Sequence, residues 1–174
     1  MQSKKRQVFL GVEPAYHSYE NSKFVVIPCP YEATTTYGKG TRNGPKAILS
    51  ASQQVECFDE ELGFEPYLKS WIYTFKPVTF NHLPKVVEKV VRDKKIPVIL
   101  GGEHSLTPWV VKVVAKSYPK LSVLQLDAHA DLRDSYEGKK NSHACTLRRV
   151  LEICPAVQVG VRSISVEEFE WAKK

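Results

Sequence analysis

The sequence has 174 residues, of which 43% are hydrophobic and 25% are charged, and its formal net charge is +6. This length suits one domain with a buried core, and the composition is that of an ordinary globular protein. The lysines and arginines are scattered, without interleaved aromatic residues, and no apolar run reaches about 18 residues, so we expect no nucleic acid partner, no membrane span and no signal peptide.

The first half of the chain contains two predicted strands and one predicted helix. Residues 1–22 show no clear period and are expected to form an irregular arm. Residues 23–27 predict a strand that Pro28 and Pro30 end, and residues 31–43 predict a loop. Gly44-Pro45 opens a predicted helix, because proline suits a first turn, with Ala47, Ile48 and Ala51 on one face. An irregular connector at 57–69 and a strand at 71–75 follow.

Helices and strands alternate through the second half. Apolar residues at helical spacing predict a helix over 81–94 that packs on a sheet. A strand is expected at 97–100, and Thr107-Pro108 predicts the N-cap and first turn of a helix to about residue 116. Strands at 121–126 and 157–161 enclose a helix at 145–153, and Ser165 caps a last helix. This order predicts a three-layer α/β/α fold whose mainly parallel central sheet is covered by helices on both faces.

The strand at 121–126 ends in Asp127-Ala-His-Ala-Asp131. Asp127, His129 and Asp131 share one side of an extended segment, and the alanines between them leave room for all three at one point. A polar loop after a strand is the alternative interpretation. However, two carboxylates and an imidazole beside a buried strand would be costly to desolvate without a cation, so we favour a metal site.

His104 follows the preceding strand, after Gly101-Gly102-Glu103. The interval from His104 to Asp127 fits one right-handed crossover, so both polar segments fall at the carboxyl ends of parallel strands, where α/β sheets place their sites. Alone, a histidine after two glycines is more often a turn residue, but next to the aspartates a ligand is favoured. Carboxylates and imidazoles without thiolates suit Mn²⁺ and, less exclusively, Zn²⁺ or Fe²⁺. Glu103 could hydrogen bond to a ligand or be a structural acid, and it is left out of the predicted site.

The four cysteines, at positions 29, 57, 145 and 154, have neither Cys-x-x-Cys nor zinc spacing and are predicted to be free thiols. Cys145 has no sign of a nucleophile-and-base pair around it. We therefore expect it to be a small packing residue.

Three motifs together resemble the ureohydrolases, and the agmatinases in particular: Gly101-Gly-Glu-His-Ser105, Asp127-Ala-His-Ala-Asp131 and Ser142-His-Ala-Cys-Thr-Leu-Arg-Arg149. Gly44-Pro-Lys-Ala-Ile48 and Gly160-Val-Arg-Ser163 extend the resemblance to nearly the whole chain. The resemblance implies two Mn²⁺, with His104 and Asp131 on one, His129 on the other and Asp127 bridging both. It also implies that His143 shuttles protons, although on its own His143 reads equally well as a polar residue at a helix start.

The activity that the resemblance implies is cleavage of agmatine to putrescine and urea by a hydroxide that bridges the metals, in a cytoplasmic homo-oligomer. Arginine, guanidinobutyrate and formiminoglutamate are the sister substrates, and a metal-dependent deacetylase is a weaker alternative. The family also carries a later Ser-x-Asp-x-Asp-x-x-Asp-Pro motif, whereas this sequence has no aspartate after Asp134. Residues 1–174 are therefore predicted to be the N-terminal portion of a single such domain, inactive alone. A non-catalytic fragment, or a subunit that needs a second polypeptide, is the alternative of a different class.

Overall fold

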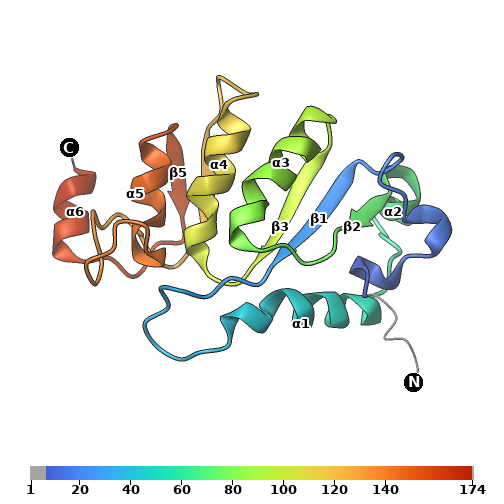
Figure 1. The fold of residues 1–174 in the computed structure, drawn as a ribbon, viewed down its shortest axis with the longest axis horizontal. Coiled ribbons are helices and arrows are strands. Elements are labelled where there is room, and N and C mark those ends of the chain that lie inside the picture. Colours follow the sequence, from blue (N-terminus) through green and yellow to red (C-terminus); the bar gives the residue numbers. More distant parts are fainter. Residues whose placement is uncertain (1–6, 174) are drawn as a thin grey trace. The chain divides into compact units, whose positions relative to one another are not determined.

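The computed structural model describes residues 7–173 and divides into two compact units (Figure 1). One unit comprises the residues up to Tyr31 together with Gly40–Gly102, and the other comprises Glu32–Lys39 together with the residues from Glu103 onward. Within residues 7–173, no helix is long and apolar enough to cross a membrane.

The first unit is built on a three-stranded parallel sheet in the order β2-β1-β3. Its strands and helices are β1 (Phe24–Cys29), α1 (Gly44–Ala51), α2 (Pro66–Ser70), β2 (Ile72–Thr74), α3 (Leu83–Arg92) and β3 (Ile96–Gly101). Residues 25–29 of the central strand are all buried although their side chains alternate in direction, so both faces of β1 are covered. Helix α3 buries Leu83, Val87, Val90 and Val91, which confirms the predicted apolar stripe.

Strand β1 continues through Pro28 to Cys29, so the prediction that Pro28 ends it was wrong. The backbone oxygen of Pro28 accepts a hydrogen bond from Val78 N at 2.9 Å, beyond the last residue of β2. Because β2 has already ended on that side of β1, the missing N–H of Pro28 removes no bond between the strands.

Helix α1 begins at Gly44-Pro45 as predicted, but the predicted apolar face was wrong. Pro45 and Leu49, one helical turn apart, are its buried residues, and Ala47, Ile48 and Ala51 are exposed. The helix contacts β1 and β3, so the face directed at the strands is the one that contains Leu49. The connector predicted at 57–69 also contains the start of α2, whose first residue is Pro66.

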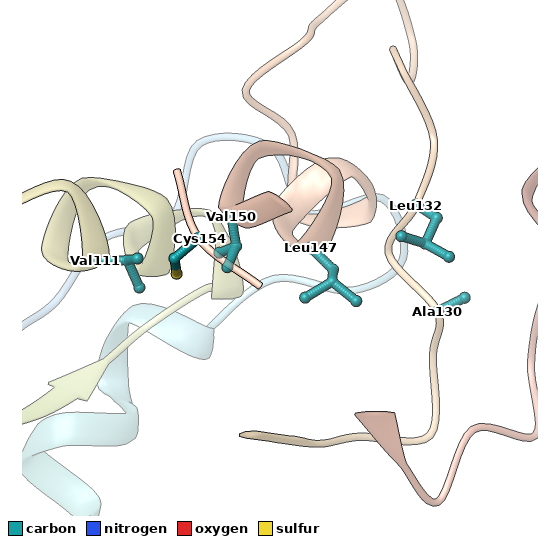
Figure 2. Close-up of a cluster of buried hydrophobic side chains, with 6 residues drawn as sticks. All are labelled: Val111, Ala130, Leu132, Leu147, Val150 and Cys154. Atoms are coloured by element: carbon teal, nitrogen blue, oxygen red, sulfur yellow. The ribbon is translucent and has the colours of Figure 1, made fainter. Parts of the chain in front are cut away.

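The second unit contains a parallel pair of strands and three helices. These elements are α4 (Thr107–Ala115), β4 (Val123–Leu126), α5 (Thr146–Leu151), β5 (Ala156–Val159) and α6 (Val166–Ala172). Helices α4 and α5 pack together, and their apolar side chains form a buried cluster with two residues of the segment after β4 and one residue that follows α5 (Figure 2). The buried members of this cluster are Val111, Ala130, Leu132, Leu147, Val150 and Cys154.

The two faces of the β4–β5 pair differ. Val123 and Ala156 are paired in register and pack against the buried cluster. On the opposite face, the paired residues are at least half exposed, at 63% for Leu124, 61% for Val157, 74% for Leu126 and 52% for Val159. Both faces of β1 are thus covered, whereas within residues 7–173 the face of β4 and β5 opposite the buried cluster is apolar and exposed.

The helix-start predictions had different outcomes at α4 and α6. Leu106 already has helical backbone angles, φ −67° and ψ −33°, so Thr107 is the first residue of α4 and does not cap it. Ser165, in contrast, caps α6 as predicted. Its side chain accepts a hydrogen bond from the Glu168 N–H, and the Glu168 carboxylate accepts one from the Ser165 N–H, which forms a capping box.

Candidate active site

Strand β4 positions Asp127 at its carboxyl end. Asp127 N donates to Val159 O at 3.1 Å, so the segment stays beside the end of β5 as it leaves the strand pair. Two further bonds join Ala128 O and Ala130 N to Ser163, at 2.9 and 3.1 Å. Residues 127–130 are therefore fixed by backbone bonds, and the small side chain of Ala130 fits into the buried cluster.

Three of the four predicted metal ligands lie together. One donor atom each from His104, Asp127 and Asp131 falls within 4.8 Å of the other two. His104 Nδ1 lies 2.8 Å from Asp131 Oδ2 and 3.4 Å from Asp127 Oδ2. Asp131 has a φ of +52°, a left-handed conformation that aspartate tolerates better than most residues. In this backbone conformation the side chain of Asp131 is directed inward, and it is buried.

His129, the fourth predicted ligand, is outside this three-residue group. Its Nδ1 lies 3.3 Å from Asp127 Oδ1, on the other carboxylate oxygen from the one near His104, and its side chain is 66% exposed. The two oxygens of Asp127 thus each have one imidazole beside them.

A hydrogen-bond chain inside the strand pair supports Asp127. Gln158 donates to both Ala130 O, at 2.9 Å, and Gln125 Oε1, at 3.2 Å, and Gln125 donates to Asp127 Oδ2 at 3.3 Å. Burial raises the pKa of Asp127, but hydrogen bonds from the His129 N–H and Gln125, with the nearby imidazoles, hold it below its usual range. The carboxylate is therefore ready to bind a cation.

His143 lies in the same cavity as the ligand candidates. The cavity has a volume of about 400 Å³, and its lining residues are His104, Asp127, His129, Asp131, Arg133, Tyr136, His143 and Ala144. His143 begins a short 3-10 turn that leads into α5, and the ring of Tyr136 meets its imidazole edge-on with the ring centres 5.8 Å apart.

The loop at 32–39 contributes contacts to His143. Thr34 Oγ1 lies 3.3 Å from His143 Nδ1, and Thr36 Oγ1 lies 3.4 Å from Nε2. Thr34 is in turn bound to Glu103, a buried carboxylate. Burial raises the pKa of Glu103, but hydrogen bonds from Ser105, Thr34 and Ala33 hold it below its usual range.

Thr34 and Gln125 were not predicted as site residues, and Glu103 was left out of the predicted site. Gln125 could have been noticed in the sequence, because it is a polar residue between two leucines in a predicted strand. No local pattern marks Thr34 as a site residue, since it is 109 positions from His143 along the chain. Cys145 is buried, and burial raises the pKa of its thiol, as expected for a packing residue. All four cysteines are free.

Comparison with known proteins shows the family. Residues 22–174 match the model of the Arginase family. The chain belongs to this family. It is 41% identical over 171 residues to the N(1)-aminopropylagmatine ureohydrolase of Synechocystis sp., covering 90% of this chain and 56% of that protein. It is 35% identical over 185 residues to the agmatinase of Bacillus cereus, covering 97% and 61%.

The fold is also similar to that of solved structures. The structure of the agmatine ureohydrolase of Thermoplasma volcanium matches with a TM-score of 0.78 and 32% identity, covering 88% of this chain and 55% of that one. The arginase-like α/β fold predicted from the sequence is thus confirmed. The chain spans between 55% and 61% of the length of these three relatives.

The donor set found here fits a divalent metal ion. One imidazole nitrogen and two carboxylate oxygens converge, and this combination suits Mn²⁺, Zn²⁺ or Fe²⁺. The ring of His129 beside the second oxygen of Asp127 offers a further nitrogen ligand.

Proposed function

We propose that the full-length protein is a manganese-dependent amidinohydrolase that hydrolyses agmatine to putrescine and urea. The observation that carries this proposal is the convergence of His104, Asp127 and Asp131 in the cavity that His143 also lines. The names of the two relatives support the guanidino substrate class, since both describe enzymes that act on agmatine or a derivative of it.

We assign the metal ligands as the sequence motifs imply. His104 and Asp131 would hold one cation, His129 would hold a second, and Asp127 would serve as a ligand to both. When bound, such cations make water a better nucleophile by lowering its pKa. Gln125 orients Asp127 through the hydrogen bond to Oδ2, and orientation of ligands by such neighbours sustains metal affinity.

His143 carries the proton that the reaction needs. Water adds to the guanidinium carbon, the bond from this carbon to the alkyl-bearing nitrogen breaks, and that nitrogen leaves as an amine after it gains a proton. The balance is one water and one agmatine consumed, and one urea and one putrescine formed. An imidazole at the cavity wall can take a proton from the attacking water and deliver it to the leaving nitrogen.

N(1)-aminopropylagmatine is a second candidate substrate. The relative with 41% identity bears the name of this activity. The bond broken is the same, and only the substituent beyond the amine differs. Homo-oligomer formation and a cytoplasmic location stay predictions.

Urea release by the full-length protein tests the proposal. Agmatine, N(1)-aminopropylagmatine and arginine would be compared as substrates, each after chelation and again after return of Mn²⁺. We expect urea from agmatine only when Mn²⁺ is present. Activity that persists after chelation would refute the metal requirement, and urea from arginine alone would refute the substrate. A larger kcat/KM for the aminopropyl compound would favour the second candidate.

A further inference from the structure

Glu103 anchors the loop at 32–39 although it was left out of the predicted site. Its Oε2 accepts hydrogen bonds from the backbone N–H groups of Ala33 and Thr34, and its Oε1 accepts from the hydroxyls of Thr34 and Ser105. The side chain is buried. A carboxylate that receives two backbone N–H groups is an acceptor, so the Thr34 hydroxyl must be the donor in their 2.6 Å contact.

The Thr34 hydroxyl therefore has only acceptor capacity left. A hydroxyl has one hydrogen and two lone pairs. The hydrogen is directed to Glu103, one lone pair accepts the His143 backbone N–H at 3.0 Å, and the other faces His143 Nδ1 at 3.3 Å. Nδ1 can satisfy this contact only by carrying a hydrogen itself. The partner of one ring nitrogen sets the tautomer, so the contact with Thr34 favours a neutral ring whose Nε2 is unprotonated.

We propose that Thr34 and Glu103 are positioning residues for His143, which hold its neutral ring as the Nδ1–H tautomer and leave Nε2 as the nitrogen that takes up and delivers the proton. The kinetic part of this inference rests on the proposed function, because it assumes that His143 transfers protons. The tautomer itself does not depend on the reaction. Both positioning residues belong to the unit that contains the site.

Two further hydroxyls lie beside the ring. Thr36 Oγ1, 3.4 Å from Nε2, can donate to this nitrogen when it is unprotonated, and Ser142 competes with Thr34 at Nδ1. Ser142 Oγ also lies 3.3 Å from His143 Nδ1, and a serine hydroxyl can donate as well as accept. Donation by Ser142 would favour a hydrogen on Nε2 instead. The Ser142→Ala variant therefore separates control of the tautomer by Thr34 from control by Ser142.

Nitrogen NMR of the full-length protein labelled with ¹⁵N-histidine measures the tautomer directly. The protein would carry Zn²⁺ in place of paramagnetic Mn²⁺, at a pH where the ring is neutral, and the His143→Ala spectrum would assign the signal. We expect Nδ1–H in the wild type, in Thr34→Ser and in Ser142→Ala, and loss of this preference in Thr34→Val. Nε2–H in the wild type, or Nδ1–H unchanged in Thr34→Val, would overturn the proposal.

Kinetics on the Mn²⁺ enzyme provide the second measurement. Thr34→Val should lower kcat by about 10- to 100-fold with little change in KM, since positioning of proton transfer acts on the chemical step. Thr34→Ser should restore most of the loss. Thr35→Val makes the same change at the next residue, whose hydroxyl accepts a hydrogen bond from the exposed Lys39 Nζ at 3.5 Å, and should keep full activity.

Stability and activity controls keep the outcomes distinct. Equal losses in Thr34→Val and Thr34→Ser, or a loss that follows a lowered melting temperature in both, would show that Thr34 only holds the loop and would refute the positioning role. If the wild type releases no urea from any guanidino compound, the proposed function fails, while the NMR result still decides the tautomer.

Discussion

Glu168 joins the start of α6 to the segment that carries the proposed metal ligands, and its removal should be strongly destabilising. The carboxylate is buried and accepts hydrogen bonds from Leu132 N at 2.8 Å, Ser165 N at 2.8 Å and Ser165 Oγ at 2.7 Å. Glu168→Ala leaves the Leu132 N–H without its partner, which costs about 1–3 kcal/mol. Loss of the capping box adds about 1 kcal/mol. We expect the free energy of unfolding to fall by about 2–4 kcal/mol.

Denaturant unfolding of the full-length protein measures this loss, and Glu167→Ala is the matched control. Glu167 is the preceding residue in the first turn of α6, but it is exposed. An exposed substitution of this kind should change stability by less than about 0.5 kcal/mol. Equal effects of the two substitutions would refute the argument. Since Leu132 directly follows Asp131, Glu168→Ala should also weaken Mn²⁺ binding, as measured by calorimetric titration.

The same carboxylate predicts a pH dependence. Burial raises the pKa of Glu168, but hydrogen bonds from Ser165 and Leu132 hold it below its usual value of 4.5. Its contribution to stability is therefore complete above the unfolded pKa and is lost as the pH falls through the lower folded pKa. The stability difference between wild type and Glu168→Gln should be largest near neutral pH and shrink as the pH falls below the usual glutamate pKa of 4.5. A difference that grows on acidification would contradict this sign.

Three further predictions concern the site and the strand pair. Asp127→Asn should lose bound Mn²⁺, whereas His143→Ala should keep its metal and lose about 10²- to 10⁴-fold in rate. Metal content by atomic absorption distinguishes the two variants, and a His143→Ala protein without manganese would contradict the assigned role. Gln125→Leu should weaken Mn²⁺ binding by about 10- to 100-fold, because Asp127 loses the hydrogen-bond donor that orients it. Calorimetric titration measures this affinity, and an unchanged affinity would show that the hydrogen bond from Gln125 to Asp127 does not support metal binding. Residues 1–174 expressed alone should aggregate and bind a hydrophobic dye because one face of β4 and β5 is apolar and exposed, and a cooperative, dye-free monomer would contradict this.

The sequence predicted what depends on local pattern. The apolar stripe of α3 and the capping box at Ser165 follow from residues three or four positions apart, and both were correct. The grouping of Asp127 and Asp131 with His104 was also predicted, because polar residues that directly follow parallel strands are typical site residues. The assignment of His129 as a ligand stays a prediction.

What the sequence could not predict depends on distant partners. The buried face of α1 is set by the strands that it contacts, and its exposed Ile48 made the opposite face look equally apolar. Thr34 contributes to the site only because the folded loop brings it against Glu103 and His143, which are 69 and 109 positions away in the sequence. The side-chain hydroxyl of a threonine in a polar loop gives no local sign of such partners.

The left-handed backbone at Asp131 restricts which residues can replace this proposed ligand. Most L-residues pay about 1–2 kcal/mol for that conformation, whereas asparagine, like aspartate, adopts it more readily. Asp131→Asn therefore changes the charge of the ligand alone, while a change to alanine, glutamate or histidine alters backbone energy and ligand chemistry together. Attempts to redesign the metal preference at this position thus have few side chains to choose from, and the limit is set by the main chain as much as by the ion.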